Sequence, residues 1–211
     1  MDELLRVIRQ IDREGATFGT SGNASARRDR EAFFITPSGV PWPDISADDM
    51  VTLATDGGAV LHGHRRPSTE WRFHQYLYRA HDWIGGIVHL HSPYATVLAT
   101  INRPVQAIHY QMVRVGDLVP VVPYRTFGTP ELAEAIEAVI RPNCRAALLE
   151  NHGLAAVGET VSEAYQAAME VEWTAMIQYR ASLLAQPRVL SSDELRAVRE
   201  SFRHYGQHPT T

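Results

Sequence analysis

The segment at residues 84–100 decides the fold, and it reads IGGIVHLHSPYATVLAT. Residues 84–90 are mostly apolar and partly β-branched, which predicts a short buried strand. Ser92 and Pro93 then predict a helix that extends to Thr100, because proline is favoured in the first helical turn. This order of strand, loop and helix places the His-Leu-His sequence at the end of the strand.

Short strands and helices alternate on both sides of this segment. Helices are expected at residues 3–14, 69–80, 129–140, 161–184 and 192–204. Strands are expected at residues 33–36, 51–54, 59–61, 107–113, 118–122, 146–149 and 154–157. Several strands are joined by tight turns, so the pattern predicts an α/β fold with a mixed, largely antiparallel sheet covered by helices.

Length and composition predict one domain over residues 1–211. The chain is 45% hydrophobic, which suffices for one substantial core. Its formal net charge of -4 is spread without a basic block, which argues against a nucleic-acid partner. No apolar stretch approaches the roughly 20 residues of a membrane span, so no membrane partner is expected and a cytoplasmic localisation is predicted.

Three histidines predict a metal site. His89 and His91 are two positions apart on a strand, so both rings can reach one ion at about 2 Å. Taken alone, this pair is as consistent with ordinary surface or core histidines as with a metal site. His152 adds a third candidate, in a turn between two strands and before a glycine. Three neutral imidazoles leave a tetrahedral ion one open position, which is the arrangement of catalytic metal sites.

Glu70 is the acidic residue expected to act beside this metal. It begins a helix after a Pro-Ser-Thr turn, where its carboxylate can project from the edge of an element. The alternative is a glutamate that only favours the dipole at a helix N-terminus. The other histidines offer no comparable ligand pattern and are interpreted as solvated or packing residues: His62, His64, His74, His81, His109, His204 and His208.

Three stretches combine small residues with hydroxyls, at residues 20–23, 38–39 and 68–69. Backbone amides in turns that glycine permits, together with hydroxyl groups, bind phosphate without any cationic side chain. Each stretch alone is more simply a turn. Only their convergence in space would make a phosphate site.

The motifs TSGNAS, TPSG, PSTEWRFH, HLHS, AIHY, YRTFGTPEL and ENHGL follow one another along the chain. In this order they resemble the class II aldolase and adducin-head family, and most closely its L-fuculose-1-phosphate aldolase branch. The resemblance extends from the first helix to the SFRHYG sequence near the C-terminus. It implies a three-layer α/β/α sandwich around the mixed sheet, usually assembled as a homotetramer with active sites between neighbouring subunits.

The resemblance also implies a role for each candidate residue. Zinc, with manganese and cobalt as alternatives, would be held by His89, His91 and His152, and Glu70 would be the acid/base group. Tyr110 from a neighbouring subunit would join the catalytic site. Tyr205, in a C-terminal tail that starts near residue 204, would also join the catalytic site. The substrate phosphate would contact Thr20, Gly22, Asn23, Ser38, Gly39, Ser68 and Thr69.

The implied activity is that of a lyase acting on a small phosphorylated sugar. It would reversibly cleave L-fuculose 1-phosphate, or a related deoxy-pentulose 1-phosphate, to dihydroxyacetone phosphate and a small aldehyde. Sugar-acid phosphate decarboxylases and methylthioribulose-1-phosphate dehydratases use the same scaffold and histidines, and both activities stay open. Ribulose-phosphate 4-epimerases are disfavoured because they carry aspartate at the position of Glu70. A non-catalytic adducin-like scaffold would not need to keep the three histidines and the glutamate.

The sequence departs from the aldolase pattern in two places. Arg114 follows the AIHY motif where the aldolases have a small neutral residue, and ENHG at residues 150–153 replaces a doubled histidine. Both departures lie where specificity for the sugar end of the substrate is set.

Overall fold

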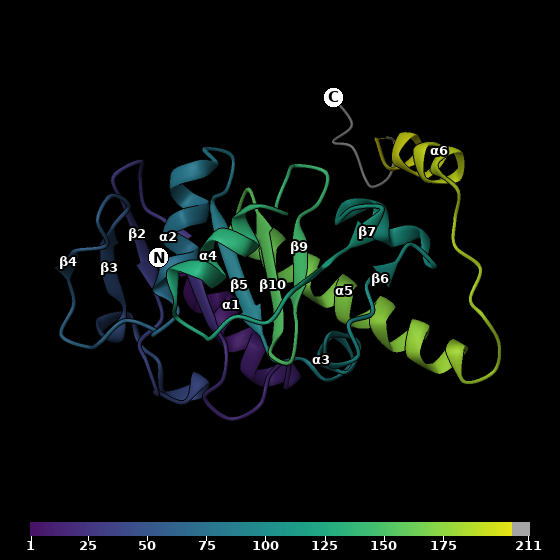
Figure 1. Ribbon diagram of the computed structural model, residues 1–211. Coiled ribbons are helices and arrows are strands. Elements are labelled where there is room, and N and C mark those ends of the chain that lie inside the picture. The colour runs from purple at the N-terminus through teal and green to yellow at the C-terminus, as the bar shows by residue number, and fades with distance from the viewer. Residues whose placement is uncertain (204–211) are drawn as a thin grey trace.

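A mixed eight-stranded sheet forms the centre of the structure, a computed structural model that describes residues 1–203 (Figure 1). Its strands lie in the order β4-β3-β2-β1-β5-β10-β9-β8, and β6 pairs with β7 in a separate two-stranded sheet. All neighbours in the large sheet are antiparallel except β8 and β9, which are parallel. The strands are β1 (Asn23–Arg27), β2 (Ala32–Ile35), β3 (Val51–Ala54), β4 (Val60–His62), β5 (Gly86–Leu90), β6 (Val105–Gln106), β7 (Leu118–Val119), β8 (Val121–Val122), β9 (Ala146–Leu149) and β10 (Gly153–Gly158).

Helices cover both faces of the large sheet. One face packs against α1, α3 and α5, and the opposite face packs against α2 and α4 (Figure 1). The helices are α1 (Asp2–Glu14), α2 (Trp71–Ala80), α3 (Pro93–Thr100), α4 (Pro130–Glu137), α5 (Val161–Ser182) and α6 (Ser192–Arg203). Short 3-10 helices lie at Trp42–Asp44, Ala47–Asp49 and Tyr110–Arg114. The predicted α/β/α sandwich around a mixed, largely antiparallel sheet is therefore confirmed.

The central strands divide their side chains between the two layers. Ile87 of β5 packs in the core beneath α2 and α4, and Val88 packs in the core beneath α1, α3 and α5. Leu154 and Ala155 of β10 divide in the same way. This alternation follows from the two-residue period of a strand, and it fixes which layer each polar side chain of the sheet faces.

Local signals set several helix ends as the sequence predicts. α1 stops at Gly15, which has a left-handed backbone (φ 59°) that glycine adopts without a steric penalty. The hydroxyl of Thr129 accepts a hydrogen bond from Leu132 N at the start of α4, and Thr160 does the same for Glu163 N at the start of α5. α2 begins one residue after Glu70, so Glu70 occupies the N-cap position rather than one inside the helix, and its side chain makes no capping hydrogen bond.

The region between α3 and α4 differs from the prediction of two long strands. Residues 107–113 do not form a strand, because the buried Met112 and Val115 are three apart, a helical spacing, and Tyr110–Arg114 is a 3-10 helix. Residues 118–122 form two short strands, since β7 pairs with β6 whereas β8 pairs with β9. β1, the central strand between β2 and β5, is not among the strands predicted from the sequence. Its sequence NASAR is small and polar and carries little strand propensity.

Within the described residues 1–203, no helix combines the length and the apolar character that a membrane span requires.

Candidate metal centre and phosphate pocket

Three histidine rings meet at the end of the central strands. His89 lies on β5, His91 follows it directly, and His152 lies in the turn between β9 and β10. Their ring centroids are 4.8 to 5.0 Å apart, and His89 Nε2 lies 3.1 Å from His91 Nε2. The structure thus brings together the three residues that the sequence singles out as metal ligands.

The backbone around His89 fixes the ring and its tautomer. His89 Nδ1 lies 2.9 Å from the carbonyl oxygen of Leu154, so Nδ1 carries the proton and donates it. In the neutral ring, Nε2 has a lone pair that points toward the other two rings. Gly153 permits this close packing, because a Cβ atom there would lie 2.5 Å from the carbonyl oxygen of Leu90.

Glu70 completes the cluster from the opposite side. Its Oε2 lies 3.1 Å from His89 Nε2, and its Oε1 lies 3.4 Å from His152 Nε2. The side chain is buried, and in the described part of the chain Oε1 has no hydrogen-bond partner. One potential ligand atom from Glu70 and one from each histidine all lie within 4.8 Å of one another.

This donor set fits a divalent metal ion. Imidazole and carboxylate groups are ligands of zinc and related ions, and their atoms here can surround a single point. The unsatisfied Glu70 Oε1 is a buried polar atom of the kind that an ion or a bound molecule accounts for.

Electrostatics keep two rings neutral and the carboxylate ionised. Burial and the nearby His89 ring lower the pKa of His91 to about 4, and the same two causes lower the pKa of His152 to about 4. Burial alone would raise the pKa of Glu70, but the attraction of His89 and a hydrogen bond to it outweigh burial and lower this pKa to about 2. Burial would also lower the pKa of His89, but the attraction of Glu70 and the hydrogen bonds to Glu70 and to the Leu154 carbonyl outweigh burial and raise this pKa. Near neutral pH the cluster therefore offers two neutral rings and one negative charge, and a metal cation would compete with a proton for His89 Nε2.

A cavity of about 290 Å³ opens beside this cluster. Glu70, His91 and His152 form one part of its wall, while His89 is fully buried and does not contribute to the lining. The wall also contains all seven residues expected to bind phosphate: Thr20, Gly22, Asn23, Ser38, Gly39, Ser68 and Thr69. The three small-residue stretches therefore converge on one cavity.

Backbone pairing holds two of these stretches side by side. Pro37 and Pro67 form an isolated antiparallel bridge, with Ser38 N donating to Arg66 O and Ser68 N donating to Thr36 O. Gly22, in the third stretch, has a left-handed backbone (φ 83°), and a Cβ atom there would lie 2.4 Å from the carbonyl oxygen of His89. Only glycine lets this loop approach the metal-bearing strand so closely.

Five residues of the cavity wall were not singled out from the sequence. They are Pro37, Tyr124, Arg125, Phe127 and Asn151. Tyr124 and Phe127 are more than half exposed, which is unusual for aromatic rings in a loop before a helix. The YRTFG sequence immediately before the Thr-Pro start of α4 was the available signal, since exposed aromatic side chains favour binding surfaces.

Tyr110, one of the two tyrosines predicted to be catalytic, does not line this cavity. Tyr110 begins the 3-10 helix, is 49% exposed, and stacks on Phe202 of α6 with a centroid distance of 6.0 Å. It is absent from the residues that line the cavity, as expected if it acts in a neighbouring subunit. Tyr205 lies outside the described residues.

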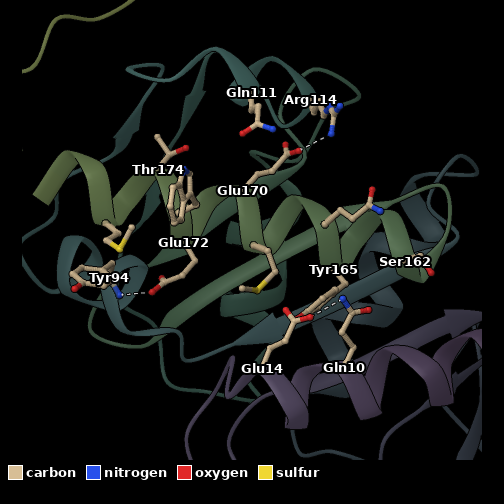
Figure 2. A pocket seen from close by; sticks show the side chains of 14 residues that line it. Gln10, Glu14, Tyr94, Gln111, Arg114, Ser162, Tyr165, Glu170, Glu172 and Thr174 are labelled. Carbon is tan, nitrogen blue, oxygen red and sulfur yellow. Dashed lines mark hydrogen bonds and ion pairs between the residues drawn. The ribbon is translucent and has the colours of Figure 1, made fainter. Parts of the chain in front are cut away.

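A larger groove of about 650 Å³ follows α5 (Figure 2), and none of its lining residues belongs to the histidine cluster. Its acidic groups serve structural contacts. Glu172 accepts hydrogen bonds from the first backbone amides of α3, Glu14 accepts one from the Tyr165 hydroxyl, and Glu170 pairs with Arg114 at 3.1 Å (Figure 2). The groove therefore lacks the converging ligands that mark the smaller cavity.

Comparison with known proteins agrees with this geometry. Residues 2–179 match the family described as Class II Aldolase and Adducin N-terminal domain. The chain is 37% identical to the 5-methylthioribulose-1-phosphate/5-deoxyribulose-1-phosphate aldolase of Rhodospirillum rubrum, over 96% of this chain and 90% of that protein. It is 36% identical to the 5-deoxy-D-ribulose 1-phosphate aldolase of Bacillus thuringiensis serovar kurstaki, over 98% of this chain and 96% of that protein.

A solved structure of an L-fuculose 1-phosphate aldolase superposes with a TM-score of 0.90 at 36% identity, covering 96% of this chain and 95% of the other. The sequence match and the structural match cover nearly the same residues. The chain belongs to the class II aldolase and adducin N-terminal domain family.

Proposed function

We propose that this chain is a metal-dependent class II aldolase that reversibly cleaves a ketose 1-phosphate to dihydroxyacetone phosphate and a small aldehyde. One observation carries the proposal: the three histidines and Glu70 converge on the same cavity as three phosphate-type loops. The relatives named above support it, because each is named an aldolase of a sugar 1-phosphate. The proposed substrates are 5-deoxyribulose 1-phosphate, a deoxy-pentulose phosphate, and L-fuculose 1-phosphate.

The proposed metal is zinc, with manganese or cobalt as alternatives, held by His89, His91 and His152. A bound divalent cation would polarise the ketose carbonyl and stabilise the negative charge that develops as the carbon–carbon bond breaks. The sequence contains no lysine. A Schiff base between a lysine amine and the ketose carbonyl, the other common route to this cleavage, is therefore closed to this chain.

Glu70 is proposed as the group that moves the proton on carbon. When the bond breaks, the hydroxyl that becomes the aldehyde loses a proton, and the carbon that remains in dihydroxyacetone phosphate keeps the electron pair. Glu70, which is ionised at rest, would take up the released proton and deliver it to that carbon. In the direction of synthesis the same carboxylate would remove that proton. The free Oε1 and its position at the cavity wall support this role, because a proton carrier needs one unoccupied atom within reach of the substrate.

The phosphate is proposed to bind at the mouth of the cavity, where Ser38, Gly39 and Thr69 are exposed. Replacing Ser38 by alanine is expected to raise KM for the ketose phosphate about 10-fold with kcat little changed, since one hydrogen bond to a charged group is lost. Inhibition by inorganic phosphate should weaken by the same factor. Thr100→Ala is the control, because that exposed hydroxyl bonds Val97 O within its own helix. An unchanged KM and phosphate inhibition would remove Ser38 from the phosphate site.

The proposed assembly is a homotetramer in the cytoplasm, in which residues 1–211 form one domain and the tail from about residue 204 brings Tyr205 to the active site. Tyr110 would hydrogen-bond, in a neighbouring subunit, the hydroxyl that becomes the aldehyde and relay its proton. The absence of Tyr110 from the wall of its own cavity supports this arrangement. The groove along α5 also supports an oligomer. Trp173 in that groove is 53% exposed, and large aromatic side chains are enriched at protein–protein interfaces.

Mixing two damaged subunits tests this arrangement. Tyr110→Phe and Glu70→Gln are each expected to lower activity strongly when present in every subunit. Hybrids made by coexpression should regain activity, because some sites then combine an intact Glu70 with an intact Tyr110 from the neighbour. Activity of the purified hybrid no higher than that of the two separate variants would place both groups in one subunit.

The deciding experiment is the release of dihydroxyacetone phosphate from a panel of ketose 1-phosphates, including the two named above. Metal-loaded and chelator-treated protein are assayed side by side. Metal-dependent release would support the aldolase, and the preferred sugar would identify its substrate. Failure of every substrate, with protein shown to hold the metal, would overturn the aldolase and favour a decarboxylase or a dehydratase on the same scaffold.

A further inference from the structure

A buried chain of hydrogen bonds leads away from Glu70 into the interface between β1 and α2. Asn23 Nδ2 donates to Glu70 Oε2 at 3.0 Å, and Asn23 Oδ1 lies 2.6 Å from His74 Nε2. On the other side of the ring, Ser25 Oγ lies 2.6 Å from His74 Nδ1 and 2.8 Å from the Tyr78 hydroxyl. Exposure is 2% for Asn23 and 0% for Ser25 and His74.

Two regular elements build this chain. Asn23 and Ser25 are two apart on β1, so both face α2. His74 and Tyr78 are four apart on α2, and Glu70 precedes His74 by the same interval at the N-cap, so all three side chains lie along one face. β1 also pairs Asn23 with His89 of β5, which places the start of the chain directly beside the metal cluster.

The hydrogen bonds all run in one direction, with each group donating to the next group toward Glu70. The Asn23 amide donates to Glu70, so its oxygen must accept, and His74 Nε2 must therefore carry the proton. The neutral ring then accepts at Nδ1 from the Ser25 hydroxyl, whose oxygen accepts from Tyr78. Burial keeps the imidazole neutral by lowering the pKa of His74 to about 3. Each group thus has a single role that is fixed by the next.

We infer that His74, locked in one tautomer by Ser25, is a positioning residue that holds the Asn23 amide and thereby aims the Glu70 carboxylate at the substrate. This inference rests on the proposed function of Glu70. Without the His74 donor, the buried Asn23 oxygen would be unsatisfied, and the amide would turn to find another partner. Glu70 would then lose the one amide that fixes Oε2, and small misplacements of a catalytic group are costly in rate.

His74→Leu tests the inference, with proton exchange as the main readout. Exchange of the carbon-bound hydrogen of dihydroxyacetone phosphate with deuterated water, followed by NMR, isolates the step assigned to Glu70 from the rest of the cleavage. The variant is expected to keep its metal and its KM within about 2-fold while exchange and kcat fall about 10- to 100-fold. His74→Gln restores an amide donor toward Asn23 and should recover most of the rate.

Two further variants separate positioning from general stability. Ser25→Ala keeps the ring but releases its tautomer, so a smaller loss of about 3- to 10-fold in exchange is expected. Gln75→Leu is the matched control, because Gln75 is a buried polar neighbour on the same helix that bonds Thr55 O, away from Glu70. It should lower thermal stability and leave exchange per bound metal unchanged.

Each outcome decides the matter. Three results would each overturn the positioning role. The first is proton exchange in His74→Leu equal to that of the wild type, and the second is an equal loss of exchange in Gln75→Leu and His74→Leu. The third is a wild-type His74 that nitrogen NMR shows to be protonated at Nδ1. Wild-type exchange with selective loss in the His74 and Ser25 variants would establish it. Wild-type protein that holds metal but neither exchanges nor cleaves would overturn the proposed function and this inference together.

Discussion

Replacing His89 by alanine is expected to abolish both metal binding and catalysis. His89 is the fully buried residue among the proposed ligands, and its Nε2 lies 3.1 Å from both His91 Nε2 and Glu70 Oε2. Loss of this ring leaves two histidines and Glu70 around an enlarged hole. Because the metal supplies several kcal/mol of transition-state stabilisation, kcat should fall by at least about 10³-fold.

Metal analysis after dialysis, together with kcat, checks this result. Removal of a buried side chain also costs stability, so His91→Ala is measured in parallel, since that ring is only partly buried at the cavity wall. His81→Ala is the control, because His81 pairs with Glu137 at 3.2 Å on the far end of α2. Stoichiometric metal retained by both His89→Ala and His91→Ala would contradict the proposed ligand set.

Glu70→Gln is expected to lower kcat about 10³-fold while the protein keeps its metal. The amide preserves the volume of the side chain and can still accept from Asn23, but it cannot carry the proton. KM should change little, because the phosphate loops are untouched. Proton exchange into dihydroxyacetone phosphate should fall in parallel with kcat.

The control for this variant is Glu172→Gln, which weakens the acceptor at the start of α3 and should affect stability rather than turnover. Two results would oppose the proposal. Full activity of Glu70→Gln would remove the carboxylate from catalysis, and metal loss in proportion to activity would make it a fourth ligand instead.

The sequence predicts the fold well where side-chain pattern and packing agree. Residues 84–100 form a strand, a loop and a helix in the expected order. The two rings of the His-Leu-His sequence lie close enough together to bind one ion, as their spacing predicts. β1 was not predicted because its side chains are small and polar, and two of them form hydrogen bonds at the candidate site instead of packing in the core. Asn23 and Ser25 serve Glu70 and His74, so the strand lacks the apolar signal that identifies its neighbours.

The candidate site divides in the same physical way. Ligand spacing and glycine turns are local, so the histidines and the phosphate loops can be proposed from the sequence alone. The contact of His74 with Asn23 could not be predicted in this way, because nothing local in the sequence distinguishes an imidazole that only packs from one that joins a buried hydrogen-bond chain. The cavity wall at Tyr124 and Phe127 depends on how the loop before α4 folds over residue 69, where a Cβ at Gly128 would lie 2.7 Å from Thr69 O.

The order of strands in the large sheet also has a consequence for how the protein matures. β1, β5 and β10 are neighbours in space but are encoded far apart, and the turn that carries His152 belongs to the last hairpin of the sheet. A chain emerging from the ribosome therefore cannot assemble the full ligand set until this hairpin has been synthesised and has inserted beside β5. We expect metal capture to be among the final events of folding, because such long-range pairings close late.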